Sequence, residues 1–265
     1  MKFLIPTIVF ALIFWSFKYD EQKFLKTNSL NSNLNNSDTI IKMEFPLNSL
    51  STLNVQMGNQ NSRISVFIYR DTYLHATLNT NKSNSQKIKI KQEADVLSLE
   101  LDKKSSKIES DMTLILFTPM IKSVNLFSHG YVEINEFTEI NELQTMISGC
   151  GMIRINSTSL FYSSIKNLNC TVYGSGEIVV DGKIKTENCH LTVFGEGELR
   201  LKSIKTKKAI INMNGNGVIS ITPLESLSGV IYGGGRVFYY GNLTNPKVEI
   251  HGCGELNLND QQYTE

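Results

Sequence analysis

A Gly-x-Gly motif recurs at nearly even intervals through the second half of this 265-residue chain. Aligned on the second glycine, seven lines match, from LFSHGYVEI to EIHGCGELNL, and they are 18 to 25 residues apart. Each line alternates apolar and polar residues on both sides of the glycines, which is typical of half-buried strands. A unit of about 20 residues that pairs with copies of itself predicts a solenoid. The glycines assigned to its turns are Gly130, Gly149, Gly151, Gly174, Gly176, Gly195, Gly197, Gly215, Gly217, Gly233, Gly235, Gly252 and Gly254.

The alternation also predicts which side chains face the core. After the turn, the inward pairs run from Val132/Ile134 to Leu256/Leu258, and before it they end at Val248/Ile250. Adjacent rungs would lie about 4.8 Å apart. Glycine suits such a corner because it accepts a positive φ and lets stacked backbones approach. The sequence therefore predicts an all-β, single-stranded solenoid with rungs of about 20 residues.

The chain before the repeat also reads as strands, although its turns lack the Gly-x-Gly motif. Residues 44–258 are therefore predicted to form one β-helix domain, in which the earlier strands are irregular coils that cap the solenoid. Residues 259–265 form a polar tail. The predicted early strands cover residues 52–57, 63–69, 73–78, 87–91, 95–101 and 112–117.

The N-terminus carries the apolar run FLIPTIVFALIFWSF. A membrane-spanning helix needs about 20 apolar residues, so the run is better suited to a signal peptide. Residues 1–20 are interpreted as a signal peptide or an uncleaved signal anchor, and a buried core segment is the third interpretation. Residues 21–43 are Asn/Ser-rich and predict a flexible tether. The expected location is therefore secreted or cell-surface, with membrane contact only through an uncleaved N-terminal segment.

Four cysteines and five glycosylation sequons accompany the export signal. Cys150 and Cys253 occupy the same turn position five rungs apart, about 24 Å, so they cannot pair within one solenoid. Cys170 and Cys189 are either a disulfide or buried free thiols, and pairing between molecules through the turn cysteines stays open. Because asparagine is abundant, two interpretations of the sequons have equal weight: chance matches, or sites used in a host that glycosylates secreted proteins. The sequons lie at Asn35, Asn81, Asn156, Asn169 and Asn242.

The repeat, together with the segments LNVQMGNQNSRISVFI and DMTLILFTPMIKSVNLFSHGYVEI, resembles the auto-transporter adhesin head GIN domain family over roughly residues 45–258. The resemblance implies a right-handed parallel β-helix behind a signal peptide, and an adhesin-like role. The chain departs from the family pattern in two places. Its opening turn reads Gly58-Asn59-Gln60-Asn61 rather than a Gly-Ser-Gly type, and no Gly-Ile-Asn triplet occurs.

One outward position, just before the first glycine of each turn, is repeatedly aromatic. It holds Phe127, Tyr173, Phe194 and Tyr232, with His251 beyond them. Such a column binds sugar rings or protein partners, or it only stabilises the sheet by stacking. Tyr173, Phe194 and Tyr232 are the candidate ligand-binding residues, and the candidate partners are a glycan or a surface protein.

An enzymatic site is the main competing interpretation of the outer surface. Glu177 and Glu198 occupy equivalent positions on adjacent rungs, about 5 Å apart, which is similar to the carboxylate pair of a retaining glycosidase. The alternative is a solvated glutamate column neutralised by Arg200. The basic stretch from Arg200 to Lys208 could meet an anionic glycan or headgroup, or form a solvated strand-turn face balanced by nearby glutamates. We assign no catalytic, cofactor-binding or metal-binding residue.

The charge balance narrows the classes of partner. Lys and Arg number 26 against 25 Asp and Glu, which argues against nucleic-acid binding. The leading hypothesis is a secreted or cell-surface, non-catalytic binding or adhesion module. The alternatives are a self-assembling structural solenoid and a polysaccharide-active enzyme.

Overall fold

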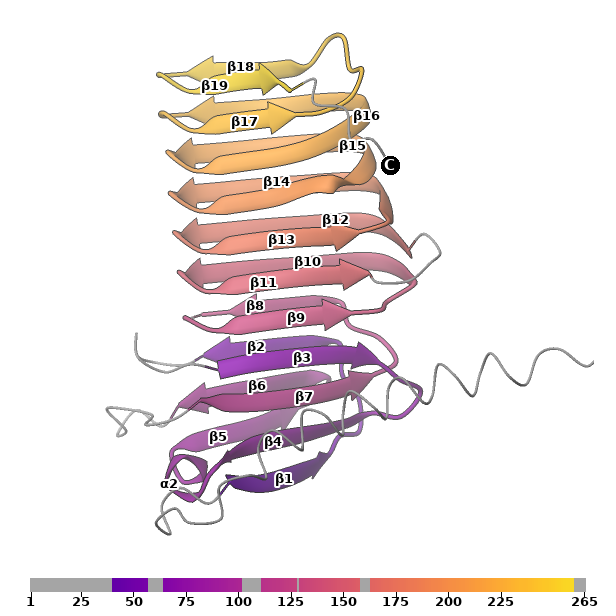
Figure 1. Ribbon diagram of the computed structural model, residues 1–265, viewed down its shortest axis with the longest axis vertical. Coiled ribbons are helices and arrows are strands. Elements are labelled where there is room, and N and C mark those ends of the chain that lie inside the picture. The colour runs from indigo at the N-terminus through magenta and orange to yellow at the C-terminus, as the bar shows by residue number, and fades with distance from the viewer. Residues whose placement is uncertain (1–39, 57–63, 102–110, 128, 158–162, 260–265) are drawn as a thin grey trace, which may run out of the picture. The chain divides into compact units, whose positions relative to one another are not determined.

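The computed structural model describes residues 40–56, 64–101, 111–127, 129–157 and 163–259, and residues 40–265 group into one compact unit (Figure 1). The predicted signal segment, Asn35, most of the tether and most of the polar tail lie outside the described residues. The first strand, β1 (Ile40–Pro46), begins four residues before the predicted start of the domain.

The described chain winds as a parallel β-solenoid, as the sequence predicted. In each rung one strand runs into the glycine turn and the next runs back from it, so two parallel sheets face each other, and the winding is right-handed (Figure 1). We call the strands that lead into the turns the first sheet and those that leave them the second sheet. The first sheet contains β8 (Ser123–Leu126), β10 (Glu139–Gly149), β12 (Ser163–Gly174), β14 (Ile184–Gly195) and β18 (Lys247–His251). The second contains β9 (Tyr131–Asn135), β11 (Met152–Ser157), β13 (Glu177–Gly182), β17 (Arg236–Tyr239) and β19 (Glu255–Leu258).

Two long strands pass from the second sheet to the first around the corner opposite the glycine turns. They are β15 (Glu198–Gly215) and β16 (Val218–Tyr232). The pairing of β12 with β14 and of β14 with β15 places Gly174, Gly195 and Gly215 in one column. The register derived from the glycine spacing is thus confirmed, and the backbone ladder continues through the turns, where Glu198 N–H donates to the Gly176 carbonyl at 3.0 Å.

The two glycines of each turn are required for different reasons. Gly195, the first glycine of its turn, has a φ of +112°, and a Cβ there would lie 2.7 Å from the carbonyl oxygen of Gly174. Gly197, the second glycine, is buried; a Cβ would meet Val172 Cγ1 at 2.4 Å and the Gly176 carbonyl oxygen at 2.9 Å. The first glycine therefore sets the backbone angle of the corner, and the second leaves room for the side chain of the preceding rung.

Some of the predicted N-terminal strands form parallel rungs of the solenoid, but their order in space differs from their order in the chain. The rung of β2 (Thr52–Gln56) and β3 (Ile64–Arg70) lies between two later rungs, because β2 pairs with both β6 and β8 and β3 with both β7 and β9. The rung below it is made of β6 (Val96–Leu101) and β7 (Met112–Thr118). A sequence pattern gives strand faces but not this insertion, which depends on long-range pairing.

Antiparallel strands close the N-terminal end of the solenoid. β4 (His75–Asn81) pairs with β7 and with β1, and β5 (Ile88–Glu93) pairs with β6. A single helical turn, α2 (Lys82–Ser85), joins β4 to β5, and Asn81 caps it by accepting from Asn84 N–H at 2.7 Å. The sequence predicted irregular coils capping the solenoid here; β4 and β5 are instead antiparallel strands at its N-terminal end. None of the helices in the described part of the chain is long and apolar enough to cross a membrane.

The core is a continuous stack of the inward side chains between the two sheets. The column through Ile178, Leu199, Ile219 and Val237 has 0% exposure throughout. The last rung departs from this pattern, because Ile250 is 42% exposed and Leu258 47% exposed although both have inward parity. The predicted inward positions are confirmed, and among the described residues no layer of side chains lies above the final rung.

The four cysteines are all free thiols, and no disulfide joins Cys170 to Cys189. Cys170 lies opposite Leu191, and Cys189 lies opposite Leu168, so the two are in adjacent rungs and offset by two positions. Burial raises the pKa of Cys170 to about 12 and also raises the pKa of Cys189. Both behave as small apolar core residues, which is one of the two predicted alternatives.

We expect a maleimide to label only Cys150 and Cys253 in the folded protein, because these two thiols are exposed. The thiolate is the reactive form, and burial both raises the pKa of the other two thiols and blocks access to them. Peptide mass spectrometry before and after denaturation checks this expectation. Fast labelling of Cys170 in the folded protein would contradict the assigned core.

Candidate functional site: an aromatic column beside the glycine turns

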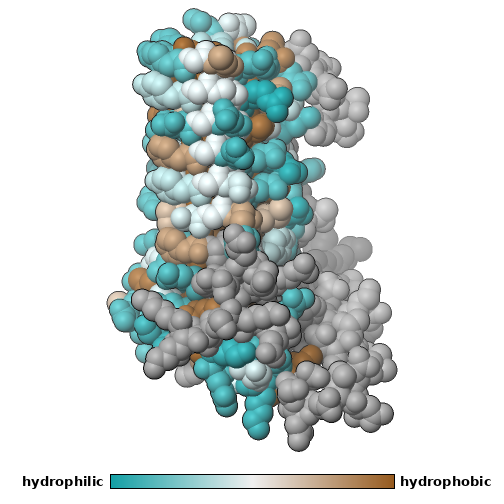
Figure 2. All heavy atoms as spheres, turned by 90° about the vertical axis from the view of Figure 1, so that its left-hand side faces the viewer, coloured by the Kyte–Doolittle hydropathy of each residue, from teal (hydrophilic) through white to brown (hydrophobic). Residues whose placement is uncertain are grey.

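The outward position before each glycine turn forms a column on the first sheet. The strand registers place Ser148, Tyr173, Phe194, Asn214, Tyr232 and His251 on successive rungs. Tyr173 is 45% exposed and Tyr232 is 47% exposed, so the rings lie on the surface. In Figure 2, which looks onto the turn side, a vertical band of near-neutral residues is flanked by separate brown patches rather than by one apolar surface.

The rings are stacked in two pairs. Tyr173 and Phe194 lie 5.1 Å apart between ring centroids at an interplanar angle of 5°. Tyr232 and His251 lie 4.9 Å apart at 14°. Since these separations are close to the spacing between rungs, the ring faces are turned toward neighbouring rungs. We call these four residues the aromatic column.

Asn214 occupies the rung between the two pairs and is exposed. Phe194 and Tyr232 are therefore two rungs apart, about 10 Å. The gap has a ring on each side and an amide, which both donates and accepts hydrogen bonds, in its middle. Flat apolar faces with a polar group between them suit a ligand whose faces are apolar and whose rim is polar.

Sequence reasoning found part of this arrangement. It placed Tyr173 and Phe194 on adjacent rungs, which the register confirms. Phe127 follows β8, one rung before Ser148, so Ser148 lies between it and the stacked rings. The sequence also placed His251 in this position beyond Tyr232, but it did not predict that the two rings stack. Equal spacing from the turn glycines of adjacent rungs was the signal that could have predicted this contact.

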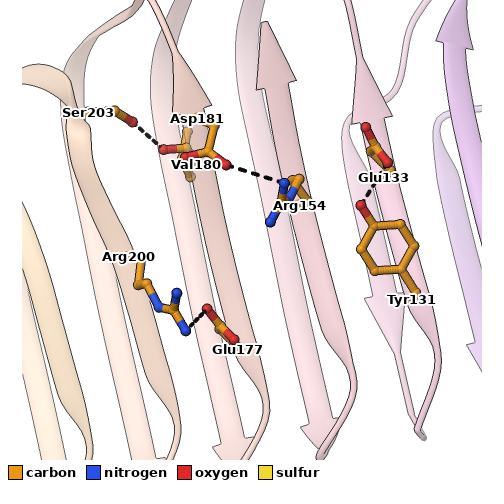
Figure 3. A network of polar contacts seen from close by, with 8 residues as sticks. All are labelled: Tyr131, Glu133, Arg154, Glu177, Val180, Asp181, Arg200 and Ser203. Atoms are coloured by element: carbon orange, nitrogen blue, oxygen red, sulfur yellow. Dashed lines mark hydrogen bonds and ion pairs between the residues drawn. The ribbon is translucent and has the colours of Figure 1, made fainter.

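The carboxylates of the predicted enzymatic pair, Glu177 and Glu198, lie on the strands that leave the glycine turns. Figure 3 shows Glu177 with Arg200 among the polar contacts of this face. Arg200 contacts both carboxylates, Glu177 at 2.6 Å and Glu198 at 3.0 Å. Arg154, two rungs before Arg200 on the same sheet, lies 3.7 Å from Asp181. The contacts thus match the predicted alternative, in which Arg200 neutralises a glutamate column.

Glu177 is the more buried member of the pair, with a side chain that is 18% exposed. Burial raises its pKa, while the Arg200 guanidinium opposes that rise and Glu198 adds to it. Tyr131, on the same face, donates to Glu133 at 2.7 Å, and burial also raises its pKa. Guanidinium and hydroxyl groups of the protein itself already contact these carboxylates. Their presence on this face therefore requires no substrate.

A shallow groove of about 520 Å³ lies at the corner opposite the glycine turns. Lys166, Lys185 and Lys207 line it together with Glu139 and Glu187, and Lys207 lies 3.8 Å from Glu187. The basic stretch of β15 therefore faces acidic residues of neighbouring rungs. The mixture of signs supports the predicted solvated face rather than an anion site.

Four of the sequons lie in the described residues. Asn81 is 8% exposed and its side chain caps α2; Asn156 and Asn169 are half-buried, whereas Asn242 is exposed. Use of the sequons stays a prediction, and Asn242 has the most accessible side chain. Among the described residues, no group of three or more His, Cys, Asp or Glu side chains is placed to hold a metal ion.

The fold and this site define a parallel β-solenoid domain with a repetitive outer surface. The family described as "Putative auto-transporter adhesin, head GIN domain" matches residues 59–242. The chain belongs to this family, as the resemblance of its glycine rungs indicated. No curated protein matches the sequence.

Solved structures show the same fold at low sequence identity. A "putative adhesin" from Bacteroides fragilis NCTC 9343 superposes with a TM-score of 0.72 at 17% identity, covering 85% of this chain and 100% of that chain. A "putative lipid binding protein" from Parabacteroides distasonis ATCC 8503 gives a TM-score of 0.63 at 18% identity, covering 84% of this chain and 98% of that one. A "putative adhesin" from Parabacteroides merdae ATCC 43184 gives 0.63 at 14% identity, with 84% and 97% covered.

Proposed function

We propose that this protein is a non-catalytic binding module of an exported, adhesin-type protein, and that the aromatic column contacts a glycan. The observation that carries the proposal is the pair of exposed ring stacks, Tyr173 on Phe194 and Tyr232 on His251, with Asn214 between them. Membership in an adhesin-head family and the apolar N-terminal run support export to the cell surface.

Sugar rings fit this surface because their faces are apolar and their rims carry hydroxyl groups. Aromatic rings bind such faces, and Asn214 can donate to and accept from the hydroxyl groups. The column lies on regular strands, so the rings are held at fixed positions without a further cost of ordering on binding. A rigid, repetitive platform favours an extended ligand whose units repeat along the solenoid axis.

The absence of catalysis is part of the proposal. Arg200 contacts both candidate carboxylates, and in the corner groove Lys207 lies 3.8 Å from Glu187. Neither arrangement leaves an acid and a base converging on open space, which hydrolysis of a glycosidic bond requires.

A screen of the full-length chain against glycan and surface-protein arrays tests this function. We expect glycan binding that weakens about tenfold or more in the double variant Tyr173→Ala, Phe194→Ala, because each lost stacking contact contributes about 1 kcal/mol. The measurement is the Kd of the best array ligand by calorimetry.

The matched control is Phe127→Ala. Phe127 occupies the same slot and is 39% exposed, but Ser148 separates it from the stacked rings. Its removal should leave the Kd unchanged. Equal binding by the double variant and the parent would exclude the column as the site. If the arrays returned a protein ligand and no glycan, the proposed ligand class would be wrong.

A further inference from the structure

The C-terminal end of the solenoid exposes side chains that belong to the core. Ile250 on β18 is aligned with Ile231 on β16, yet Ile250 is 42% exposed and Ile231 is 0% exposed. Leu258 on β19 is aligned with Tyr239 on β17, and their exposures are 47% and 8%. Within the described residues, β18 and β19 pair on one side only, so their outer edges carry free backbone hydrogen-bonding groups.

The opposite end of the solenoid is protected. Its outermost strands, β1 and β5, pair in antiparallel fashion with the strands above them. Lys42 and Glu44 form an ion pair on β1 at 3.0 Å, and Lys89, Lys91 and Glu93 alternate along β5. Charged side chains on edge strands oppose the addition of another strand. The two ends therefore differ in how they terminate. Antiparallel strands end the N-terminal side, where Ile40 on β1 is 53% exposed, whereas the C-terminal side ends in a regular rung whose inward residues Ile250 and Leu258 are exposed.

We propose that two copies of this protein pair tail to tail through their last rungs, related by a two-fold axis parallel to the strands. The axis places β18 of one copy on β19 of the other in antiparallel fashion, and the same contact forms twice. Such an interface is closed, so it makes a dimer and not a fibre.

The side-chain parity of the last rung fits this arrangement. Because the glycine turns coincide under the axis, Ile250 meets Leu256 of the second copy and Val248 meets Leu258 of the second copy. All of these positions face inward, so the exposed Ile250 and Leu258 and the partly buried Val248 and Leu256 of each copy cover those of the other. The dimer thus supplies a layer of side chains over the last rung, and removal of this apolar surface from water favours association.

The charges also favour this axis over the alternative two-fold, which runs perpendicular to the sheets. In the proposed dimer, His251 lies opposite Glu255 of the second copy, and Glu249 lies opposite Asn257 of the second copy. The alternative axis would pair β18 with β18 of the second copy. Glu249 would then lie opposite Glu249 of the second copy, which is destabilising. No like charges oppose each other in the proposed register.

The cysteine at the last turn gives a sharp reporter of the geometry. Cys253 is at the tip of the turn beside the proposed axis, so the two Cys253 residues would lie one rung apart, about 5 Å. Cys150 occupies the same turn position five rungs earlier and is also exposed. The two Cys150 residues of a dimer would be eleven rungs apart, about 53 Å.

Cross-linking of the full-length chain tests the proposal. With a short bismaleimide, the Cys150→Ser variant should form a covalent dimer through Cys253, and the Cys253→Ser variant should not. In sedimentation equilibrium, Ile250→Lys should raise the Kd of the dimer about tenfold or more. The matched control is Ile210→Lys, which changes an equally exposed isoleucine on the outer face of β15 and should leave the Kd unchanged.

Three outcomes would overturn the tail-to-tail dimer. The first is a monomer at every concentration, and the second is cross-linking through Cys150 as fast as through Cys253. The third is a full-length monomer that dimerises only when residues 260–265 are deleted, which would make the chain's own tail the occupant of the edge. These outcomes do not depend on the glycan proposal, since the aromatic column and the outer edge are tested by different variants.

Discussion

Replacing Gly197 with alanine is expected to lower the free energy of unfolding by about 3 kcal/mol. Position 197 is buried under the preceding rung, and a Cβ there would lie 2.4 Å from Val172 Cγ1 and 2.9 Å from the Gly176 carbonyl oxygen. The valine could turn away only by leaving its place in the core, and the carbonyl is held by the ladder to Glu198 N–H at 3.0 Å. The overlap must therefore separate two rungs.

Gly234→Ala is the matched control, because it is a glycine of the same kind of turn in a later rung. A Cβ at position 234 would meet only the amide end of the Asn216 side chain, at 2.8 Å. That side chain is exposed and accepts one long hydrogen bond, from Gly234 N–H at 3.2 Å, so it can move aside. We expect a change within about 0.5 kcal/mol. Urea unfolding followed by circular dichroism measures both, and equal stability of the two variants would show that the second glycine is not sterically required.

Two neighbouring isoleucines of β15 provide the second test. Ile211→Ala should lower the free energy of unfolding by about 2 to 5 kcal/mol, because Ile211 is 1% exposed and its loss leaves a cavity between the sheets. Ile210→Ala should change the stability by less than about 0.5 kcal/mol, because Ile210 points outward and is 47% exposed.

The comparison uses the same substitution at adjacent positions, so differences in helix or strand propensity cancel. Thermal and urea unfolding of the two variants against the parent give the values. A larger loss at position 210 than at position 211 would mean that the strand is turned over by one residue, which would invert every face assigned to β15.

Much of the fold was predictable because it depends on local sequence patterns. The spacing of Gly174, Gly195 and Gly215 set the rung, and strict alternation set the inward parity of Leu199 and Ile211. The insertion of β2 and β3 between later rungs was not predictable, since it depends on which distant edges pair. Alternation is the same whichever neighbour a strand takes.

The candidate site divides in the same way. The stacking of Tyr173 on Phe194 followed from register alone, because equal offsets from the turn place two rings on adjacent rungs. The binding of Arg200 to both Glu177 and Glu198 was one of two predicted alternatives, and side-chain contacts were needed to choose between them. The state of Cys170 and Cys189 required the same information.

The sequence by itself determined that this protein is a β-solenoid, because glycine positions and the period-two pattern are local properties of each rung. Only the tertiary structure decided how the ends differ. The N-terminal end is closed by antiparallel strands and the C-terminal edge leaves Ile250 and Leu258 exposed. A rung's sequence is the same in the middle and at the end of a stack, so its exposure depends on whether another layer lies above it.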